Sequence, residues 1–225
     1  MLQTSNYNKY IQLNNVTVSY EKFGNRVIAL DNVSLSVSKG EWVYIIGPNG
    51  SGKTTLLKSI AKQVEIDQGT IVINERNLNV INSKDLASTL FYVNQNPMLG
   101  SISQMTIWEN LIATDIRNKR IKRNNYEALL KDVGLLEHKH HLVHFLSGGQ
   151  RQILTLLIAQ MRNADILLLD EPASSLDPVN AEITRQIINK MYDSNKTILY
   201  VTHQERIISN SDKRIIKLDK GKLYE

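Results

Sequence analysis

The chain has 225 residues, 42% of them hydrophobic, which permits one domain with an appended subdomain or two small domains. Its net charge of +5 would suit an anionic partner, but a phosphate-handling protein with lysine-rich loops reaches the same balance. The lack of cysteine excludes disulfides, zinc-thiolate sites and thiol catalysis. No secretion signal is expected at the start, and residues 86–108, the longest uncharged stretch, are too interrupted by polar residues to be expected to span a membrane.

The first predicted elements form an antiparallel β layer. Apolar residues alternate loosely in residues 10–20 and cleanly from Val33 to Val37, as in strands that are half buried in a sheet. Residues 21–26, which contain Gly24, predict a hairpin connection. This layer precedes the stretch that carries the chemistry.

Residues 47–55 read GPNGSGKTT and match the phosphate-binding loop pattern G-x-x-x-x-G-K-[ST]. The glycines let backbone N–H groups point into one concavity, Lys53 adds positive charge, and the Thr54 hydroxyl suits Mg²⁺. Residues 42–46 predict a buried strand entering the loop, and residues 54–62 predict a helix whose N-terminal dipole favours an anion. In this context a chance glycine-rich turn is the weaker interpretation, and we predict nucleotide binding.

Two further side chains, Tyr20 before the loop and Gln95 after it in the sequence, are each open to two interpretations. Tyr20 ends an upstream strand, where its ring could stack on adenine, although an aromatic residue there more often serves packing. The apolar strand at residues 90–93, which follows a short predicted strand at residues 70–73, runs into Gln95. Gln95 could reach a metal or an attacking water, although an ordinary polar loop residue is the plainer interpretation.

From about Pro97 the pattern becomes helical. Thr106 and Glu109 match a capping box, and residues 126–133 have helical spacing that ends at Gly134. The basic residues of the intervening run are Arg117, Lys119, Arg120, Lys122 and Arg123. A nucleic-acid patch is one interpretation, but no aromatic residues interleave for base stacking, so a solvated face is favoured.

A histidine-rich tract follows, with His138, His140, His141 and His144. The spacing of His140 and His144 would bring both to one face of a helix, where transient metal binding is conceivable. Glu137 is the one nearby carboxylate in the sequence, and a variable surface connection is the favoured interpretation.

Residues 146–150 read LSGGQ and open a strongly apolar helix at residues 151–161. A serine and two glycines at a helix N-terminus form a second anion site from backbone N–H groups. The apolar strand at residues 166–169 then delivers Asp170 and Glu171 at its carboxyl end, where open α/β sheets place ligands. Beside a phosphate loop, such an Asp holds Mg²⁺ and the adjacent Glu can accept a proton from an attacking water.

The remaining predicted elements are a helix after Asp177, a buried strand at residues 197–201 and a closing hairpin at residues 214–223. His203 follows the strand and could contact a γ-phosphate. With its motifs in this order, the chain resembles the nucleotide-binding subunit of an ATP-binding cassette (ABC) transporter over essentially its whole length. The phosphate loop together with LSGGQ is highly specific for that family.

The resemblance implies an α/β fold with a P-loop NTPase parallel-sheet core, an N-terminal antiparallel β layer and an inserted helical subdomain. It implies a single ABC ATPase domain over residues 1–225, with the insert at about 95–165. It also implies ATP and Mg²⁺ as cofactors. The residues that would hold the phosphates are Gly47, Pro48, Asn49, Gly50, Ser51, Gly52, Lys53, Thr54 and Thr55.

The same resemblance assigns the other roles. Tyr20 would stack on adenine, and Thr54, Gln95 and Asp170 would serve Mg²⁺. Glu171 would be the general base and His203 the γ-phosphate sensor, so that Glu171, His203 and Gln95 form the expected catalytic group. The signature residues Ser147, Gly148, Gly149 and Gln150 would bind ATP held by the other protomer, with Asp177 communicating across the interface.

The partners implied are a second copy, closing head-to-tail over two ATP molecules, and an integral membrane permease that seats a coupling helix in a groove lined by the segment after Gln95. The location implied is the cytoplasmic face of the membrane, peripherally bound. No nucleic-acid partner is expected. Residues 95–111 and the LSGGQRQILTLLIA stretch look similar to bacterial amino-acid-type importers, including a group assigned to tryptophan or tyrosine uptake, so an extracytoplasmic substrate-binding protein would be a further partner.

A soluble ABC ATPase without a permease is the alternative. The translation type needs two cassettes, and the repair type needs a long heptad insert, which the sequence lacks. The metal-cluster assembly type is a single cassette and stays open. A non-catalytic scaffold is disfavoured because every catalytic position is filled.

Overall fold

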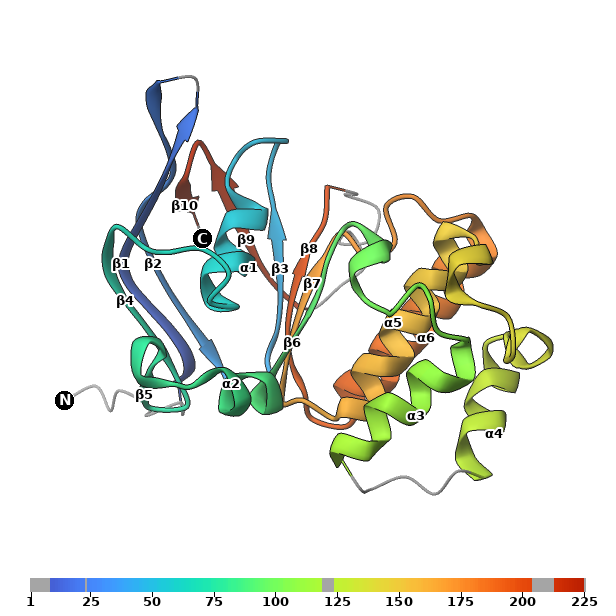
Figure 1. Ribbon diagram of the computed structural model, residues 1–225. Helices are drawn as coiled ribbons and strands as arrows, with labels where there is room; N and C mark the ends of the chain where they lie inside the picture. The colour runs from blue at the N-terminus through green and yellow to red at the C-terminus, as the bar shows by residue number, and fades with distance from the viewer. Residues whose placement is uncertain (1–8, 23, 119–123, 204–212, 225) are drawn as a thin grey trace. The chain divides into compact units, whose positions relative to one another are not determined.

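The computed structural model describes residues 9–22, 24–118, 124–203 and 213–224 (Figure 1). The chain divides into two compact units, each of which is described by itself. The first unit contains residues 1–92, 165–170 and 195–225, and the second contains residues 93–164 and 171–194. The predicted single domain with an insert at about 95–165 stays a prediction.

Two sheets and two helices make up the first unit within the described residues. Its strands are β1 (Lys9–Lys22), β2 (Asn25–Ser38), β3 (Trp42–Ile46), β4 (Gln68–Ile73), β5 (Arg76–Asn77), β6 (Leu90–Val93, at the boundary), β7 (Ile166–Asp170), β8 (Thr197–Val201), β9 (Arg214–Asp219) and β10 (Lys222–Tyr224). Its two α-helices are α1 (Lys53–Ile60) and α2 (Ser83–Thr89), and a short 3₁₀ turn, η1 (Leu78–Val80), precedes α2.

The strand pairing confirms the predicted fold class. Among the described residues, β2-β1-β4-β5 form an antiparallel four-stranded sheet, and β10-β9-β3-β8-β7-β6 form a six-stranded sheet. Parallel pairing joins β9 to β3, β3 to β8 and β8 to β7, while β10 pairs antiparallel with β9. The predicted antiparallel layer is therefore the first sheet, and the predicted parallel core is the second.

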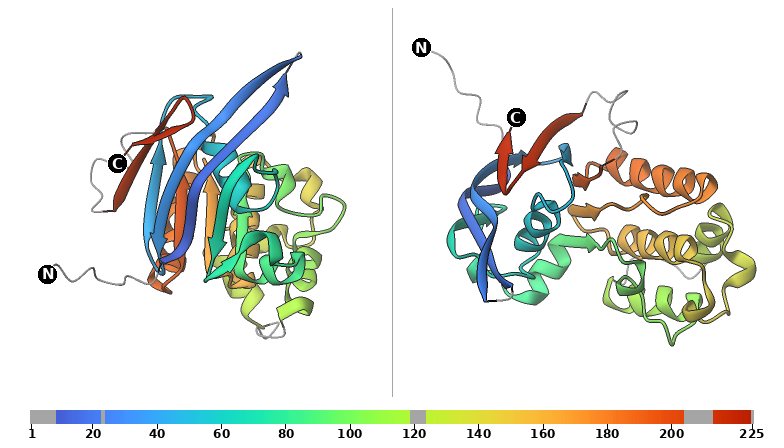
Figure 2. Two further views of the ribbon diagram at one scale, coloured as in Figure 1. Left: turned by 90° about the vertical axis from the view of Figure 1, so that its left-hand side faces the viewer. Right: turned by 90° about the horizontal axis from the view of Figure 1, so that it is seen from above.

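Helix α1 lies between these two sheets, as Figures 1 and 2 show from different sides. Leu56, Leu57 and Ile60 of α1 have no exposed surface and join a core with apolar residues of both sheets. In β3, Val43 and Ile45 face this core, while Trp42 and Tyr44 alternate to the other face and lie against Tyr200. An eight-residue helix is unstable alone, so packing on both sides determines its position.

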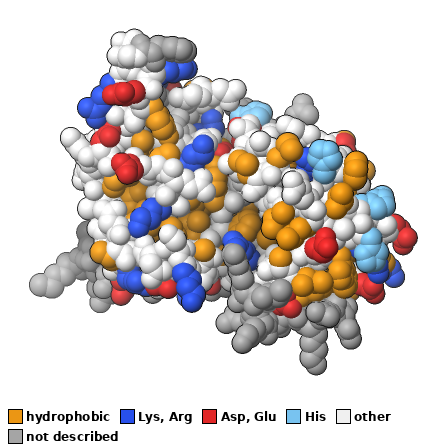
Figure 3. Space-filling model, viewed as in Figure 1, with side chains coloured by type: hydrophobic (Ala, Val, Ile, Leu, Met, Phe, Trp, Pro, Cys, Tyr) orange, Lys and Arg blue, Asp and Glu red, His pale blue; other side chains and the backbone are white. Residues whose placement is uncertain are grey.

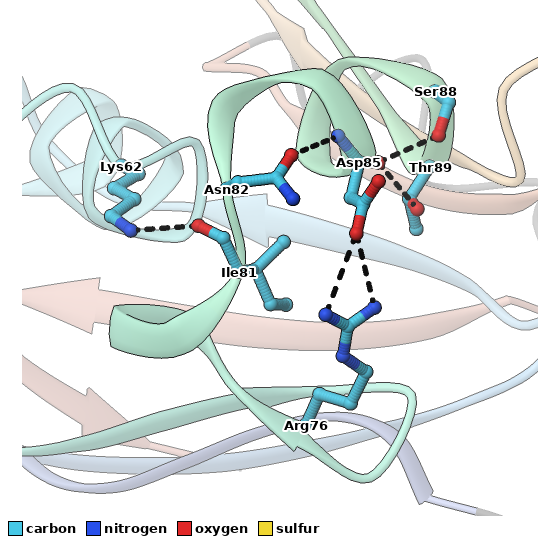
Figure 4. A network of polar contacts seen from close by, with 7 residues as sticks. All are labelled: Lys62, Arg76, Ile81, Asn82, Asp85, Ser88 and Thr89. Atoms are coloured by element: carbon cyan, nitrogen blue, oxygen red, sulfur yellow. Dashed lines mark hydrogen bonds and ion pairs between the residues drawn. The ribbon is translucent and has the colours of Figure 1, made fainter.

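A polar network fixes the chain between α1 and α2 (Figure 4). The Lys62 ammonium donates to the carbonyl oxygens of Leu78, Asn79 and Ile81 at 2.9–3.2 Å. Asn82 caps α2 by accepting from the Asp85 amide, and Asp85 also pairs with Arg76. Since α2 leads directly into β6, the network holds the segment that delivers β6 to its sheet.

The second unit is helical. Its elements are η2 (Pro97–Leu99), α3 (Ile107–Asn118), α4 (Asn124–Asp132), η3 (Leu136–His138), η4 (Val143–Phe145), α5 (Gly148–Arg162) and α6 (Pro178–Asp193). Helices α5 and α6 run side by side, as the right-hand view of Figure 2 shows. The predicted capping box before α3 is confirmed, because Thr106 accepts from the Glu109 amide and Glu109 accepts from the Thr106 amide.

The histidine tract does not form the helix that its spacing suggested. Two single 3₁₀ turns, η3 and η4, flank a non-helical connection, so His140 and His144 do not share a helix face. The close pair is His138 and His141, whose Nδ1 atoms are 3.2 Å apart. Within the described part of the chain no group of three or more His, Cys, Asp or Glu side chains could hold a metal. Figure 3 shows histidine side chains (pale blue) on the surface of this unit.

Two further expectations concern a membrane span and the basic run. None of the helices in residues 9–22, 24–118, 124–203 and 213–224 has both the length and the apolar character that a membrane span requires. Residues 119–123 of the basic run lie outside the described residues, and for Arg117 the structure describes only the backbone, near the end of α3.

We expect Tyr10→Phe to lower the free energy of unfolding by about 1 kcal/mol, the contribution of one hydrogen bond. The Tyr10 hydroxyl donates to Asp165 Oδ2 at 3.2 Å, and the side chain is 4% exposed. Burial, followed by the negative charge of Asp165, raises the pKa of Tyr10 from 10.0 to about 12. The difference in free energy of unfolding between wild type and Tyr10→Phe is therefore full below pH 10. It declines between pH 10 and pH 12, because the Tyr10 hydroxyl loses its proton at lower pH in the unfolded chain than in the folded one.

Urea denaturation at several pH values measures this effect. Tyr224→Phe, which removes an exposed hydroxyl from β10, is the control and should leave stability unchanged. Equal stability of Tyr10→Phe and wild type at pH 7 would contradict the prediction.

Candidate functional site

The loop between β3 and α1 is built for close backbone approach. Gly47 has a φ of 149°, and a Cβ placed on it would lie 2.0 Å from the Leu218 carbonyl oxygen. Gly52, with a φ of 106°, occupies the N-cap of α1, and its carbonyl accepts from the Leu56 amide at 2.8 Å. Because a side chain at Gly47 would collide with backbone of β9, this position requires glycine. The first amides of α1 have no carbonyl partner within the helix, as at any helix N-terminus, which suits an anion.

Lys53 and Thr54 begin α1 and carry the polar chemistry of the loop. The Lys53 ammonium donates to the carbonyl oxygens of Gly47 and Pro48 at 2.8 and 2.9 Å, and the residue is 6% exposed. The Thr54 hydroxyl donates to Asp170 Oδ1 at 3.2 Å. Asp170 ends β7 and is 1% exposed. The structure thus brings together the predicted loop and the predicted strand-end carboxylate.

A third side chain, which sequence reasoning missed, completes this group. The Tyr92 hydroxyl of β6 donates to Asp170 Oδ2 at 3.0 Å. Burial, followed by the negative charge of Asp170, raises the pKa of Tyr92 far above its usual range. Tyr92 therefore remains a protonated donor at physiological pH. A hydroxyl-bearing residue near the end of a buried strand was the available signal.

Tyr20 lies over the start of α1. Its ring is 40% exposed, and its hydroxyl approaches Thr55 Oγ1 at 3.4 Å. The residue therefore presents an aromatic surface beside the start of α1, and its stacking on adenine stays a prediction. Val27, its cross-strand partner in β2, is 47% exposed.

In the second unit, Gln95 and Glu171 lie together. Gln95 Nε2 donates to Glu171 Oε2 at 3.4 Å. Glu171 has a φ of 49°, a left-handed conformation that is uncommon outside glycine and occurs at functional turns. The Ser174 amide and hydroxyl both donate to the Glu171 carbonyl, at 3.2 and 3.1 Å, and these bonds stabilise the turn.

The signature stretch forms the N-terminus of α5. Ser147 accepts from the Gln150 amide at 3.2 Å, and the Gln150 side chain accepts from the Ser147 amide at 3.0 Å. A Cβ on Gly149 would lie 2.7 Å from Asn180 Nδ2 of α6, so glycine permits this close helix contact. Gly148 has open space around its Cβ position among the described residues.

Asp177 is the N-cap of α6. It accepts from the amides of Val179 and Asn180 at 3.0 and 3.1 Å, and from Asn180 Nδ2 at 2.5 Å. The hydrogen bonds from Asn180 lower the pKa of Asp177 below its ordinary value. Asn180, which sequence reasoning missed, thus contacts both Asp177 and the Gly149 position. Asn180 therefore links the N-termini of α5 and α6.

His203 follows β8 in the first unit and is exposed. The amide of the preceding Thr202 donates to the Ile45 carbonyl of β3 at 3.1 Å, which fixes the strand end before His203. The structure therefore places two groups of predicted residues. The first unit holds residues 47–55 with Tyr20, Asp170 and His203, and the second holds Gln95 with Glu171 and residues 147–150 with Asp177.

The oxygen atoms of Asp170 and Thr54 suit Mg²⁺ as ligands. A buried carboxylate and a threonine hydroxyl are hard oxygen ligands, which this ion prefers. Such a pair is too small to coordinate Mg²⁺ alone. Mg²⁺ usually binds one or two carboxylates together with substrate phosphates, and the adjacent loop suits those phosphates. The arrangement has groups that would suit the phosphates of a nucleoside triphosphate and an accompanying Mg²⁺.

Comparisons with known proteins agree with this chemistry. The family model described as ABC transporter matches residues 30–174. The chain is 32% identical over 226 residues to the tyrosine transport ATP-binding protein of Clostridioides difficile, covering 95% of this chain and 90% of that protein. It is 32% identical over 209 residues to the cell division ATP-binding protein FtsE of Streptococcus pneumoniae, covering 90% of each.

Other relatives are longer proteins. The chain is 34% identical to the methionine import ATP-binding protein MetN 2 of Bacillus cereus over 96% of its own length but spans 65% of that protein. It spans 17% of the mating factor M secretion protein mam1 of Schizosaccharomyces pombe, at 32% identity over 100% of this chain. Among solved structures, the dimeric post-hydrolysis state of the ATP-binding cassette MJ0796 bound to ADP and phosphate matches with a TM-score of 0.83 and 30% identity, covering 96% of this chain and 97% of that one.

Proposed function

The chain belongs to the ABC transporter family as an ATP-binding cassette ATPase, and from that premise we propose how its residues carry out hydrolysis and what the hydrolysis drives. The observation that carries the proposal is the buried Asp170 carboxylate held beside the Lys53–Thr54 start of α1. We propose that residues 47–55 bind the phosphates of ATP and that Tyr20 stacks on its adenine.

Thr54, Asp170 and Gln95 would hold Mg²⁺, directly or through water. The ion would neutralise charge on the β- and γ-phosphates when bound. Lys53 and the α1 amides stabilise the same phosphate oxygens. His203, as an imidazole donor at a strand end, contacts the γ-phosphate.

Glu171 is the proposed general base. The Ser174 hydrogen bonds hold its turn, and Gln95 orients its carboxylate. Glu171 accepts the proton of the water that attacks the γ-phosphate, which separates ADP from phosphate. Because it follows Asp170 directly, one strand end supplies both the metal ligand and the base.

We propose that two copies close head-to-tail over two ATP molecules. The amides and hydroxyl of residues 147–150 then reach the γ-phosphate bound by the other copy, and Asp177 lies at the interface. The related MJ0796 cassette is dimeric. Hydrolysis of both ATP molecules reopens the dimer.

We propose a membrane permease as the partner that this cycle drives, with the ATPase bound peripherally at the cytoplasmic face. The segment after Gln95 supports this, since Met98, Leu99 and Ile102 are 48%, 69% and 51% exposed. Exposed apolar side chains close together mark an interaction surface. Figure 3 shows apolar side chains (orange) on the exposed face of the second unit.

An amino-acid-type substrate, imported with the help of an extracytoplasmic substrate-binding protein, is the finer proposal. It is supported by similarity to relatives named for tyrosine transport and methionine import, while another relative is named for cell division. The substrate would be recognised by the partner proteins, because the ATPase itself contacts ATP and the permease.

Glu171→Gln should keep ATP binding and lower kcat by about 100-fold or more, because general-base catalysis contributes on that scale. ATP hydrolysis and binding of a fluorescent ATP analogue measure the two effects. Glu182→Gln, an exposed carboxylate of α6, is the control and should hydrolyse ATP normally. Near-normal turnover by Glu171→Gln would remove Glu171 as the base.

Ser147→Arg, made in the Glu171→Gln background, should abolish ATP-driven dimers while monomers still bind ATP, because the new side chain fills the signature surface. Analytical ultracentrifugation with and without ATP measures the dimer. The control, Ser194→Arg, places the same charge at the C-terminal end of α6. That end is about 24 Å from the N-terminus of α6, so this variant should still dimerise. Dimers of Ser147→Arg would contradict the proposed contact in trans.

Affinity purification from native, detergent-solubilised membranes tests the transport role. A polytopic membrane protein should co-purify, identified by mass spectrometry, together with a substrate-binding lipoprotein if the system is an importer. Replacing Leu99 by Asp should lower the permease yield because the docking surface is proposed to be apolar. Soluble partners alone, with the protein absent from the membrane fraction, would favour an assembly ATPase instead.

A further inference from the structure

Tyr92 contacts Asp170, the proposed metal ligand, but has no part in the proposed hydrolysis. It belongs to β6, the neighbour of β7 in the parallel sheet, and Asp170 is the last residue of β7. The tyrosine hydroxyl donates to Asp170 Oδ2 at 3.0 Å, while Thr54 donates to Oδ1 at 3.2 Å. Each carboxylate oxygen therefore has its own donor.

We propose that Tyr92 is a positioning residue that fixes the rotation of the Asp170 carboxylate, so that Oδ1 faces Thr54 and the Mg²⁺ that accompanies the nucleotide. This inference rests on the proposed metal role of Asp170. Tyr92 itself touches neither the metal nor the nucleotide. It acts by restricting which Asp170 oxygen is presented.

The chemistry favours this role over simple packing. A carboxylate turns about its terminal bond in a broad, two-fold potential, so one donor at one oxygen leaves its orientation loosely defined. Donors at both oxygens define it, and hydrogen bonds to a charged acceptor are the stronger kind. Partners that orient a metal-ligating carboxylate typically contribute 10–100-fold to metal affinity or activity.

The backbone is arranged to keep Tyr92 in place. The Asp165 amide, just before β7, donates to the Thr89 carbonyl at the end of α2 at 3.0 Å, which aligns the starts of β6 and β7. The Lys62 network in Figure 4 holds the chain ahead of α2. A four-residue strand anchored at its start delivers the Tyr92 hydroxyl to the far end of β7.

The same fold contains a matched control. At the other end of β7, the Tyr10 hydroxyl donates to Asp165 Oδ2 at 3.2 Å. Tyr10→Phe and Tyr92→Phe therefore each remove one tyrosine–aspartate hydrogen bond, the first from Asp165 just before β7 and the second from Asp170 at its end. Only Tyr92→Phe removes it from the proposed metal ligand, so a general loss of stability is separated from a specific loss of positioning.

The experiment compares wild type, Tyr10→Phe and Tyr92→Phe. ADP binding is titrated in EDTA, ADP-dependent Mn²⁺ binding is followed by electron paramagnetic resonance, and ATP hydrolysis is measured against Mg²⁺ concentration. For Tyr92→Phe we expect ADP affinity in EDTA within two-fold of wild type, Mn²⁺ affinity about 10-fold weaker, and a half-saturating Mg²⁺ concentration about 10-fold higher. Excess Mg²⁺ should restore most of the kcat of Tyr92→Phe. Tyr10→Phe should match wild type in ADP affinity, Mn²⁺ affinity and half-saturating Mg²⁺ concentration.

The outcomes separate this inference from the proposed function. Wild-type Mn²⁺ affinity in Tyr92→Phe, or an equal loss of ADP binding in EDTA, would overturn the positioning role. No ADP-dependent Mn²⁺ binding by the wild type would instead overturn the proposed metal site. Tyr92→Met also lacks the hydroxyl but has a differently shaped side chain, and it must weaken Mn²⁺ affinity as much as Tyr92→Phe does. In an Asp170→Asn background, Tyr92→Phe should have no further effect on Mn²⁺ binding.

Discussion

The buried Asp170 carboxylate is the constraint on which the rest of the first unit depends. A charge that is 1% exposed is stable only when hydrogen bonds or opposite charges compensate for the lost hydration. Two of its donors are Thr54 of α1 and Tyr92 of β6. One side chain thus requires that a helix and a neighbouring strand both arrive at the end of β7. The entirely buried residues of β7 hold the carboxylate in the sheet while its oxygens are bound from two sides.

The position of α1 follows from the same requirement. It is short, and its apolar residues are covered by two sheets instead of one, so the phosphate loop is attached to a helix with little freedom to move. Gly47 lies against the Leu218 carbonyl and the Lys53 ammonium binds the loop's own carbonyls. The loop is therefore organised by its own backbone contacts, and this preorganisation lowers the entropic cost of binding phosphates.

Most elements could be predicted from the sequence because each is specified locally. The apolar runs at 42–46, 90–93 and 197–201 coincide with β3, β6 and β8, and the capping box before α3 is confirmed. The family and its ATPase activity followed from motifs with fixed spacing. The roles of Tyr20, Gln95, Glu171 and His203 stay predictions.

The parts that were missed depend on which elements become neighbours. Tyr92 faces Asp170 only because β6 lies beside β7, although 78 residues separate them in the chain. Asn180 reaches Gly149 only because α5 and α6 start at the same end. For the histidine tract a surface connection was the favoured interpretation, and the alternative helix face of His140 and His144 does not form, because spacing alone does not make a helix and the tract contains 3₁₀ turns.

The signature stretch shows how one residue serves both fold and proposed function. Ser147 caps α5 by accepting a hydrogen bond, and a hydroxyl that accepts still has its own hydrogen to donate. Capping therefore orients the Ser147 hydroxyl without using its donor. A Cβ on Gly149 would crowd the Asn180 side chain, whereas no described neighbour crowds Gly148. No described neighbour explains Gly148, so the proposed approach of a phosphate bound by a second copy would give this glycine a physical reason.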